Sequence, residues 1–453
     1  MNFKISEVFR FAVIENLNYA IVIATLFVQG FYLEPSAIGA FYISTLPSFL
    51  LLALVSQSLN LTILRGECEA TSPALSENIQ LYTTYLFVLF LVLLINQYVT
   101  NSHLSIIVVS CILLHSFFEI NSLIYEANLQ LRGRYEMVPK IRAIASFLSL
   151  STLLVLFFQG QGIIALYLFL LFGGGFKYFC HRLVSREVSG KVNLTLLLSH
   201  LRNHASYSFL NFSARNIDQY LFSFILGLGA VGVYNRSIQI IQIPIKVLNG
   251  LIAGLFLPKA IVNKVGSVVH ELQSHVSVLI IISCGFAIFF QYFLGDMLKI
   301  LWGSEWDQVS RSIIYLAPAI IIQAIIGYKT SLAVMGDLDS ILFRVGLINL
   351  TTVFPVPVFA ALYGFDEALF AYSFSYAVIG YPLYEILVSR LVLNQSYQRS
   401  LWNISEVSVP IILILVGIEH YPNLAFVGLS GWFILLLMPF YRLFGNIRNV
   451  IKS

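Results

Sequence analysis

Charged residues are scarce in this chain. Lys, Arg, Asp and Glu together make up 11% of its 453 residues, whereas about a quarter of the residues in a soluble globular domain are charged. This deficit excludes a soluble enzyme or a soluble binding module. Cysteine is also rare, and the four cysteines show no CxxC or CxxH spacing. We therefore expect neither a disulfide framework nor a metal site.

Catalytic motifs are missing as well. The sequence contains no GxxxxGK[ST] loop, no HExxH and no GxSxG, which are motifs that place phosphate-binding, metal-binding or nucleophilic groups. The segments between apolar stretches are too short to hold a catalytic domain. We therefore expect a protein that is not an enzyme and has no nucleic-acid partner. No small-residue cleavage site follows the first apolar segment, which is expected to be a retained span.

Apolar residues dominate instead. They make up 58% of the chain, and the mean hydropathy is +0.85. A helix needs about 20 residues to cross the hydrocarbon, and this length predicts an all-α polytopic membrane protein with about 14 spans. The predicted spans are residues 8–31, 37–62, 79–99, 103–126, 142–158, 162–181, 205–226, 233–257, 276–298, 309–333, 341–363, 367–390, 404–418 and 424–443.

Lys and Arg indicate the orientation of these spans, because they concentrate in cytoplasmic loops. Both terminal segments and every second loop carry them, whereas the opposite loops hold only Lys299 and Arg311. Both termini are therefore predicted to be cytoplasmic, which requires an even number of spans.

Internal repetition predicts the domain organisation. The segment Leu33–Phe41 aligns without gaps to Leu226–Tyr234, RGR after the fourth span matches MGD after the tenth, and GQGIIALY matches GFDEALFAY. The consistent offset of six spans predicts two six-helix lobes of the same orientation, with the substrate path between them. The predicted division is an N-lobe at 1–181, a cytoplasmic connecting segment at 182–204, a C-lobe at 205–391, and two further spans with a cytoplasmic tail at 392–453.

Four charged residues lie at hydrocarbon depth around the seventh and eighth spans: Arg215, Asp218, Arg236 and Lys246. Such charges are expensive in lipid and usually mark a polar interior or a substrate path. On a helix, Arg236 and Lys246 fall within an arc of about 80° and are roughly 15 Å apart along the axis. They predict a cationic wall that binds an anionic substrate. Alternatively, Arg236 reaches the interface, and Arg215 forms a structural pair with Asp218.

Acidic and aromatic residues form further polar stripes. On the fourth span, His115, Glu119 and Glu126 share one helix face with Ser122, and Glu15 lies in the first span. We predict that His115, Glu119, Asp218 and Glu15 line the cavity or couple transport to H⁺ or Na⁺. The alternatives are hydrogen bonds between helices for His115 and Glu119, a solvated boundary position for Glu126, and a headgroup position for Glu15. Tyr372 and Tyr376 on the twelfth span are candidates for contact with sugars.

The order of several landmarks carries a family resemblance. LxPxxIGxF follows the first span, NIDQYLFSFILGLGAVGVYNRS precedes Pro244 and LFLPK, and LWGSEWDQVSRSIIYLAP precedes the tenth span. This set resembles the polysaccharide transporter branch of the MOP superfamily, the Wzx-type flippases for O-antigen and related repeat units. The resemblance implies a MATE-like arrangement of helices in the bacterial inner membrane.

The same resemblance implies a cargo and partners. The cargo is an undecaprenyl-pyrophosphate-linked oligosaccharide that is turned from the cytoplasmic to the periplasmic leaflet, and the partners are a polysaccharide polymerase and a chain-length regulator. Two alternatives stay open at this point. One is a MATE-like ion-coupled small-molecule exporter, and the other is a membrane-embedded polymerase or glycosyltransferase.

Overall fold

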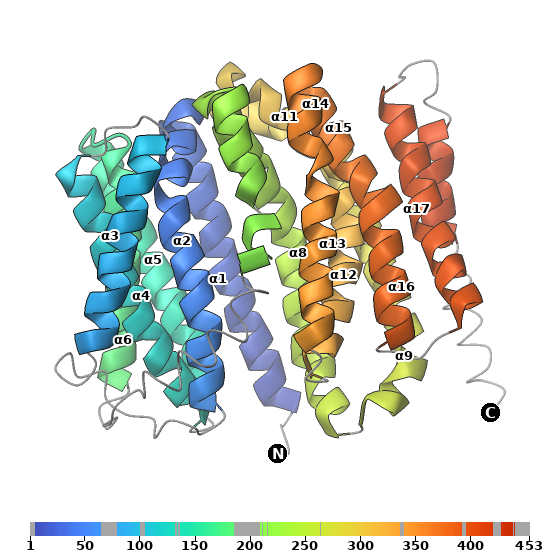
Figure 1. Cartoon of the computed structure of the whole chain (residues 1–453), viewed down its shortest axis with the longest axis horizontal. Coiled ribbons are helices and arrows are strands. Elements are labelled where there is room, and N and C mark those ends of the chain that lie inside the picture. The colour runs from blue at the N-terminus through green and yellow to red at the C-terminus, as the bar shows by residue number, and fades with distance from the viewer. Residues whose placement is uncertain are drawn as a thin grey trace. The chain divides into compact units, whose positions relative to one another are not determined.

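The computed structural model of the chain is built from helices (Figure 1). It describes residues 5–64, 79–99, 105–131, 134, 136–184, 209–210, 212–214, 216–262, 264–335, 339–391, 396–419, 427–437 and 439. The chain divides into two compact units, Asn2–Asn216 and Ile217–Ser453. We describe each unit by itself. The lobe boundaries predicted from the sequence stay predictions.

The first unit is a bundle of long helices. Its elements are α1 (Ile5–Tyr32), α2 (Pro35–Leu64), α3 (Ile79–Val99), α4 (Ile106–Leu131), α5 (Met137–Phe158) and α6 (Ile164–Val184). The most extensive packing joins α4 to α6, and α5 also packs on α6. On the other side of the bundle, α2 packs on α4 and α1 packs on α5.

The second unit has more and shorter elements. Residues 216–225 are helical and are followed by α8 (Leu228–Val262), α9 (Lys264–Phe289), η1 (Phe290–Leu294), α10 (Gly295–Trp302), η2 (Ser304–Trp306), α11 (Asp307–Leu316), α12 (Ala319–Met335), α13 (Asp339–Val353), α14 (Pro355–Leu362), α15 (Phe365–Ser375), η3 (Tyr376–Gly380), α16 (Tyr381–Leu391) and α17 (Tyr397–Glu419). Here α8 packs against both α11 and α12, and α16 packs against α17.

The long apolar helices identify a multi-pass membrane fold. By length and composition, 7 helices within the described part of the chain can cross a membrane, or up to 8 if the bent pair of Ser304–Leu316 and Ala319–Lys329 counts as one span. The third predicted span, 79–99, has the bounds of α3. Other helices extend beyond their predicted spans, and α9 begins at Lys264 instead of residue 276. The total of about 14 spans is a prediction from the required helix length.

The aligned segments start helices at equivalent positions. Pro35, the first residue of α2, aligns with Leu228, the first residue of α8. Three residues further on, Ile38 and Val231 are both fully buried. Gly227, just before α8, has φ +86, a left-handed conformation that glycine adopts without the steric penalty of a side chain. The repeat predicted from the sequence therefore has a local structural counterpart at these two turns.

Candidate functional site

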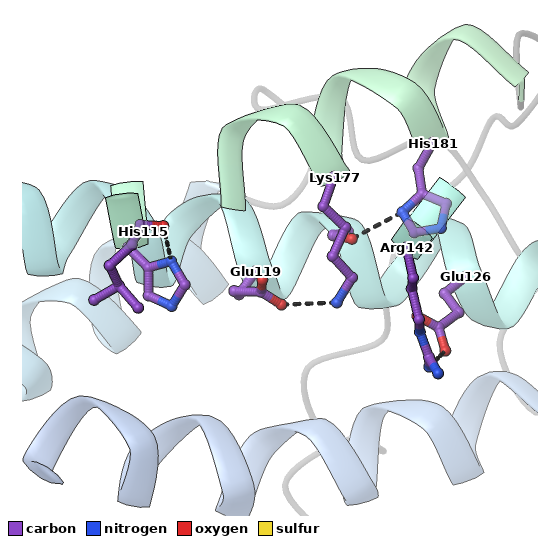
Figure 2. A network of polar contacts seen from close by, with 8 residues as sticks. His115, Glu119, Glu126, Arg142, Lys177 and His181 are labelled. Atoms are coloured by element: carbon purple, nitrogen blue, oxygen red, sulfur yellow. Dashed lines mark hydrogen bonds and ion pairs between the residues drawn. The ribbon is translucent and has the colours of Figure 1, made fainter. Parts of the chain in front are cut away.

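A polar seam joins α4 to α6 in the first unit (Figure 2). His115 Nδ1 lies 2.8 Å from the carbonyl oxygen of Leu170. Because a carbonyl oxygen only accepts, this imidazole carries its proton on Nδ1. One turn further along α4, Lys177 Nζ donates to Glu119 Oε2 at 2.9 Å. The stripe predicted on the fourth span therefore faces α6 at both residues.

The seam continues toward the C-terminal end of α4. Ser122 Oγ lies 2.8 Å from Nδ1 of His181 on α6, and Glu126 accepts a hydrogen bond from Arg142 on α5. Glu126 is buried rather than solvated, so the solvated environment considered for it above is wrong. Lys177, His181 and Arg142 were not identified from the sequence as partners of this stripe.

Close helix packing makes the seam possible. Gly174 of α6 lies directly beside α4, so that a Cβ atom built there would be 2.8 Å from His115 Nδ1 and 3.3 Å from the His115 carbonyl oxygen. A glycine at this position lets the two backbones approach, which is common where membrane helices pack tightly. This approach brings the short polar side chains of α4 within hydrogen-bonding reach of α6.

The charges of the seam compensate one another. The side chains of Glu119 and Lys177 are 21% and 17% exposed, respectively, so this pair retains some access from outside the bundle. Glu126 has a side chain only 7% exposed and is matched by Arg142. Each of the two carboxylates is matched by one cation, so the seam is chemically suited to hold helices together.

A second polar cluster surrounds Asp218 in the second unit. Its carboxylate accepts hydrogen bonds from the hydroxyl of Tyr234 and, at 2.8 Å, from the backbone N–H of Gln219. Asn235 Nδ2 donates to Gln219 Oε1 at 2.6 Å. Asp218 therefore binds α8 through Tyr234, a contact that the predicted pairing with Arg215 did not include.

Aromatic rings extend this cluster toward α15. Tyr234 and Tyr372 have ring centroids 6.5 Å apart, and Tyr372 and Tyr376 have centroids 4.9 Å apart. Gln323 Nε2 of α12 donates to the Tyr372 hydroxyl at 2.9 Å. Both predicted sugar-facing residues, Tyr372 and Tyr376, are buried within the unit. In this conformation they pack against protein rather than lie on its surface.

A buried ion pair in the second unit was missed by the sequence reasoning. Lys329 of α12 donates to Glu385 of α16, and their side chains are 4% and 0% exposed. Asn403 of α17 donates to the other oxygen of Glu385 at 2.7 Å. The signal was present, because Lys329 and Glu385 lie in the tenth and twelfth predicted spans. In the predicted repeat these spans are the counterparts of the fourth and sixth spans, so a charge on each predicts a contact.

The predicted cationic residues occupy different environments. Arg236 is fully buried, and its Nη1 donates to Gln239 at 3.1 Å on the same helix. Lys246 is exposed on α8. Arg215 lies outside the described residues, as does the side chain of Glu15, whose backbone belongs to α1. Among the predicted cations that the structure describes, Lys246 is thus the accessible one.

Metal ligands do not cluster in the described part of the chain, where no group of three or more His, Cys, Asp or Glu side chains is arranged to hold a metal ion. The acidic residues described above each contact a protonated donor instead.

A family model described as polysaccharide biosynthesis protein matches residues 76–311, which is just over half of the chain. The chain belongs to this family. The membership predicted from the landmark residues is confirmed at the level of this polysaccharide biosynthesis family. No curated protein sequence matches the chain.

Solved structures show the fold of this family member. The lipid II flippase MurJ in an inward closed conformation is similar with a TM-score of 0.67 at 14% identity, over 97% of this chain and 99% of that chain. An outward-facing multidrug resistance MATE family transporter of the MOP superfamily gives 0.60 at 12% identity, over 89% and 96%. The Vibrio cholerae MATE transporter VcmN in its bent form gives 0.58 at 12% identity, over 88% and 97%. The protein is therefore a multi-pass membrane protein with a MurJ-like and MATE-like helical fold.

Proposed function

We propose that this protein is a flippase for undecaprenyl-pyrophosphate-linked oligosaccharides, such as O-antigen repeat units, in the bacterial inner membrane. One observation carries the proposal: a member of the polysaccharide biosynthesis protein family has the fold of a lipid II flippase over 97% of its length. The similar structure is that of a lipid II flippase, and we infer a related role for this chain. Family and fold are those of a transporter, which supports a role other than catalysis.

The proposed mechanism is alternating access between two lobes. We propose the division at 1–181, 182–204, 205–391 and 392–453, with about 14 spans and both termini in the cytoplasm. The pyrophosphate and the first sugars enter a cationic path between the lobes, and the polyprenyl tail stays in lipid. Each lobe in turn closes the path on one side of the membrane.

The anion contacts are assigned to the seventh and eighth spans. Lys246 is exposed on α8, and a charge-assisted hydrogen bond from its ammonium to a diphosphate oxygen is roughly twice as strong as a neutral one. We propose that Arg215 acts with it. Arg236 is fully buried, so we propose that it holds the α8 amide side chains in place rather than touching the cargo.

The remaining predicted residues receive supporting roles. We propose that the partly exposed Glu119 and its partner Lys177, with His115, Asp218 and Glu15, form the groups that respond to a coupling H⁺ or Na⁺. Tyr372 and Tyr376 contact sugars only in a conformation that uncovers them. A polymerase and a chain-length regulator are the proposed protein partners.

Substitution of Lys246 tests this proposal in cells that carry the chain as their single copy. Lys246→Ala should abolish surface polysaccharide, and lipid-linked oligosaccharide should accumulate in the inner membrane. Lys246→Arg should retain part of the function because the positive charge is kept. The control is Lys140→Ala, whose side chain is 45% exposed and pairs with Glu136 at 3.5 Å within α5. If Lys246→Ala cells make normal surface polysaccharide at normal protein levels, the cationic path is wrong.

A small-molecule exporter is the second candidate, because MATE transporters share the fold with TM-scores of up to 0.60. It predicts that loss of the chain sensitises cells to cationic drugs while surface polysaccharide stays normal. The flippase predicts the reverse pattern. Measuring both phenotypes in one deletion strain separates the two candidates.

A further inference from the structure

The two units differ in the continuity of their helices. In the first unit, α3, α4, α5 and α6 each run without a break over 21, 26, 22 and 21 residues. In the second unit, each of the four spans that the predicted repeat makes their counterparts contains an irregularity. The sharp bend of 61° lies in one of them, whereas Val276–Trp302 and Phe343–Leu362 each remain a single candidate span. The interruptions are η1 between α9 and α10, a bend of 61° between α11 and α12, a break at Phe354 between α13 and α14, and η3 between α15 and α16.

Proline explains three of the four interruptions. Pro318 lies at the α11–α12 bend, Pro355 begins α14 with Pro357 behind it, and Pro382 follows η3. Proline lacks a backbone N–H, and its ring clashes with the carbonyl one turn earlier, which favours a bend or a widened turn there. The widening appears as the π-type turn η3, where the N–H of Tyr381 bonds to the carbonyl oxygen of Tyr376. The sequence of η1 gives no such reason for its break.

Proline is absent from the corresponding interiors of the first unit. Among α3 to α6, the one proline is Pro139 in the first turn of α5, where the N–H has no helical partner in any case. The contrast between the units therefore follows from their sequences.

The interruptions lie at a common depth. At 1.5 Å per residue, they are roughly 14 to 21 Å from the turns at Gly303 and Gly364, which is near the middle of a hydrocarbon core of about 30 Å. They divide the second unit into two parts. We call α10, η2, α11, α14 and α15 the turn block, and α9, α12, α13 and α16 the base block.

The turn block is held together by its own contacts. Ser310 Oγ of α11 donates to the carbonyl oxygen of Gly295 on α10 at 2.7 Å. Trp302 and Trp306 have ring centroids 5.1 Å apart. Ser373 Oγ of α15 donates to the carbonyl oxygen of Tyr315 on α11 at 2.7 Å. This last hydrogen bond satisfies the carbonyl oxygen of Tyr315, which the bend before α12 takes out of the regular helical hydrogen-bond pattern.

The base block has its own core and its own ion pair. Val345, Tyr384 and Val388 form a buried cluster with Ile326 and Leu387 packed against it, which joins α13 and α16 to α12. Tyr384 donates to the carbonyl oxygen of Ile326 at 3.0 Å, and Lys329 binds Glu385. Each block is therefore a packed body in its own right.

Polar contacts also cross the joint between the blocks. Gln323 donates to the Tyr372 hydroxyl at 2.9 Å, and Ser375 Oγ donates to the carbonyl oxygen of Thr352 at 2.6 Å. Gly380 rests on the same threonine, since a Cβ there would lie 2.8 Å from Thr352 Oγ1. Helix α8 passes both blocks and contacts α11 and α12. It is continuous over Leu228–Val262, with Pro244 in its interior.

We infer that the turn block tilts as a body against the base block, about the four interrupted spans, whereas the first unit has no corresponding joint in α3 to α6. In the flippase proposed above, on which this role rests, the tilt opens and closes one end of the transport path within the second unit. A kink change of about 20° over the eight residues of α14, about 12 Å, moves its far end by about 4 Å.

Distances between spin labels test the tilt on the purified full chain in lipid nanodiscs. The native cysteines Cys68, Cys111, Cys180 and Cys284 are first replaced by serine. Labels at Leu347→Cys and Ala361→Cys then span the α13–α14 break. The matched control pair, Ile144→Cys and Phe158→Cys, has the same spacing on the unbroken helix α5. A third pair, Ile300→Cys and Leu362→Cys, lies within the turn block and uses exposed positions.

We expect two distances for the pair across the break and one distance for each of the other pairs. Addition of undecaprenyl pyrophosphate should change the ratio of the two distances. A single narrow distance across the break, as in α5, would overturn the inference. So would an equally broad distribution within the turn block, because that block would then not move as a body.

Restoring the missing N–H groups gives an independent check. In the double variant Pro355→Ala with Pro357→Ala, the labels across the α13–α14 break should give one distance instead of two. Two unchanged distances would overturn the assignment of the joint to these prolines. The two distances across the break are expected even when no cargo is added. A cargo that does not change the ratio, with two distances still present, would count against the flippase but not against the joint.

Discussion

Loss of one partner of the buried ion pair in the second unit should be costly. The side chains of Lys329 and Glu385 are 4% and 0% exposed, so Lys329→Met leaves a carboxylate in a low-dielectric interior. Asn403 still donates to it, but its amide carries no compensating charge. Removal of one member of a buried pair typically destabilises a protein by about 3–5 kcal/mol.

The double variant Lys329→Met with Glu385→Leu should recover most of this loss, because two apolar side chains of similar volume replace two charges. About 1 kcal/mol should remain lost, since Asn403 then lacks the acceptor it has now. The control is Lys140→Met at the exposed pair with Glu136 on α5, where the expected cost is about 0.5 kcal/mol or less.

The assay is reversible unfolding in mixed detergent micelles, followed by tryptophan fluorescence and analysed for the free energy of unfolding of each variant. A Lys329→Met protein as stable as Lys140→Met would refute the reasoning, because the pair would then carry little net energy. A double variant less stable than the single one would refute it as well, because packing rather than charge would then dominate.

Three further predictions concern the first unit and the topology. Gly174→Ala should break the His115 contact to Leu170 and cost about 1–3 kcal/mol of unfolding free energy, whereas Gly285→Ala, where nothing lies within 4 Å of the added Cβ, should cost nothing by the same unfolding assay. Glu119→Gln should slow transport or uncouple it from an ion gradient at normal protein levels. Wild-type transport and gradient dependence in vesicles would remove Glu119 from the mechanism. Cysteines at 161 and 305 should react with an impermeant reagent in intact cells, and those at 133 and 398 should not; equal labelling would contradict the proposed orientation.

Helix positions could be predicted because apolar length is a local property of the sequence. The third predicted span agrees with α3 at both ends, and the aligned turns start α2 and α8 at equivalent residues. Prolines lie at the irregularities before α12, at α14 and after η3, but Pro47 and Pro244 lie inside the uninterrupted helices α2 and α8. The break at η1 has no such mark, and its residues, FQYFL, are ordinary for a membrane helix.

Partners of the polar residues could not be predicted in the same way. A stripe on one helix fixes a direction but does not identify the helix that it faces. For Glu119 the sequence predicts a cavity position, with a hydrogen bond between helices as the alternative, and the structure gives that residue a partner 58 positions away, Lys177. Asp218 was matched with Arg215 because the spacing of three residues is visible in the sequence, whereas its contact with Tyr234 crosses a turn.

The sign of the buried charge is not repeated between the units. Glu126 and Lys329 each lie seven residues before the glycine of their aligned turns, RGR and MGD, and both are buried. In the first unit the acid at this position is matched by Arg142 of α5, and in the second the base is matched by Glu385 of α16.

The repeat therefore preserves a compensated charge inside each helix bundle but neither its sign nor its partner. A diphosphate that bound Arg142 or Lys329 would have to displace a carboxylate already in contact, at the cost of leaving that carboxylate buried without its cation. Binding of the diphosphate to a cation that is already paired with a buried carboxylate is thus unfavourable. Exposure is therefore the reason to look for the anion contact at Lys246 of α8, whose side chain an anion can reach from outside the bundle.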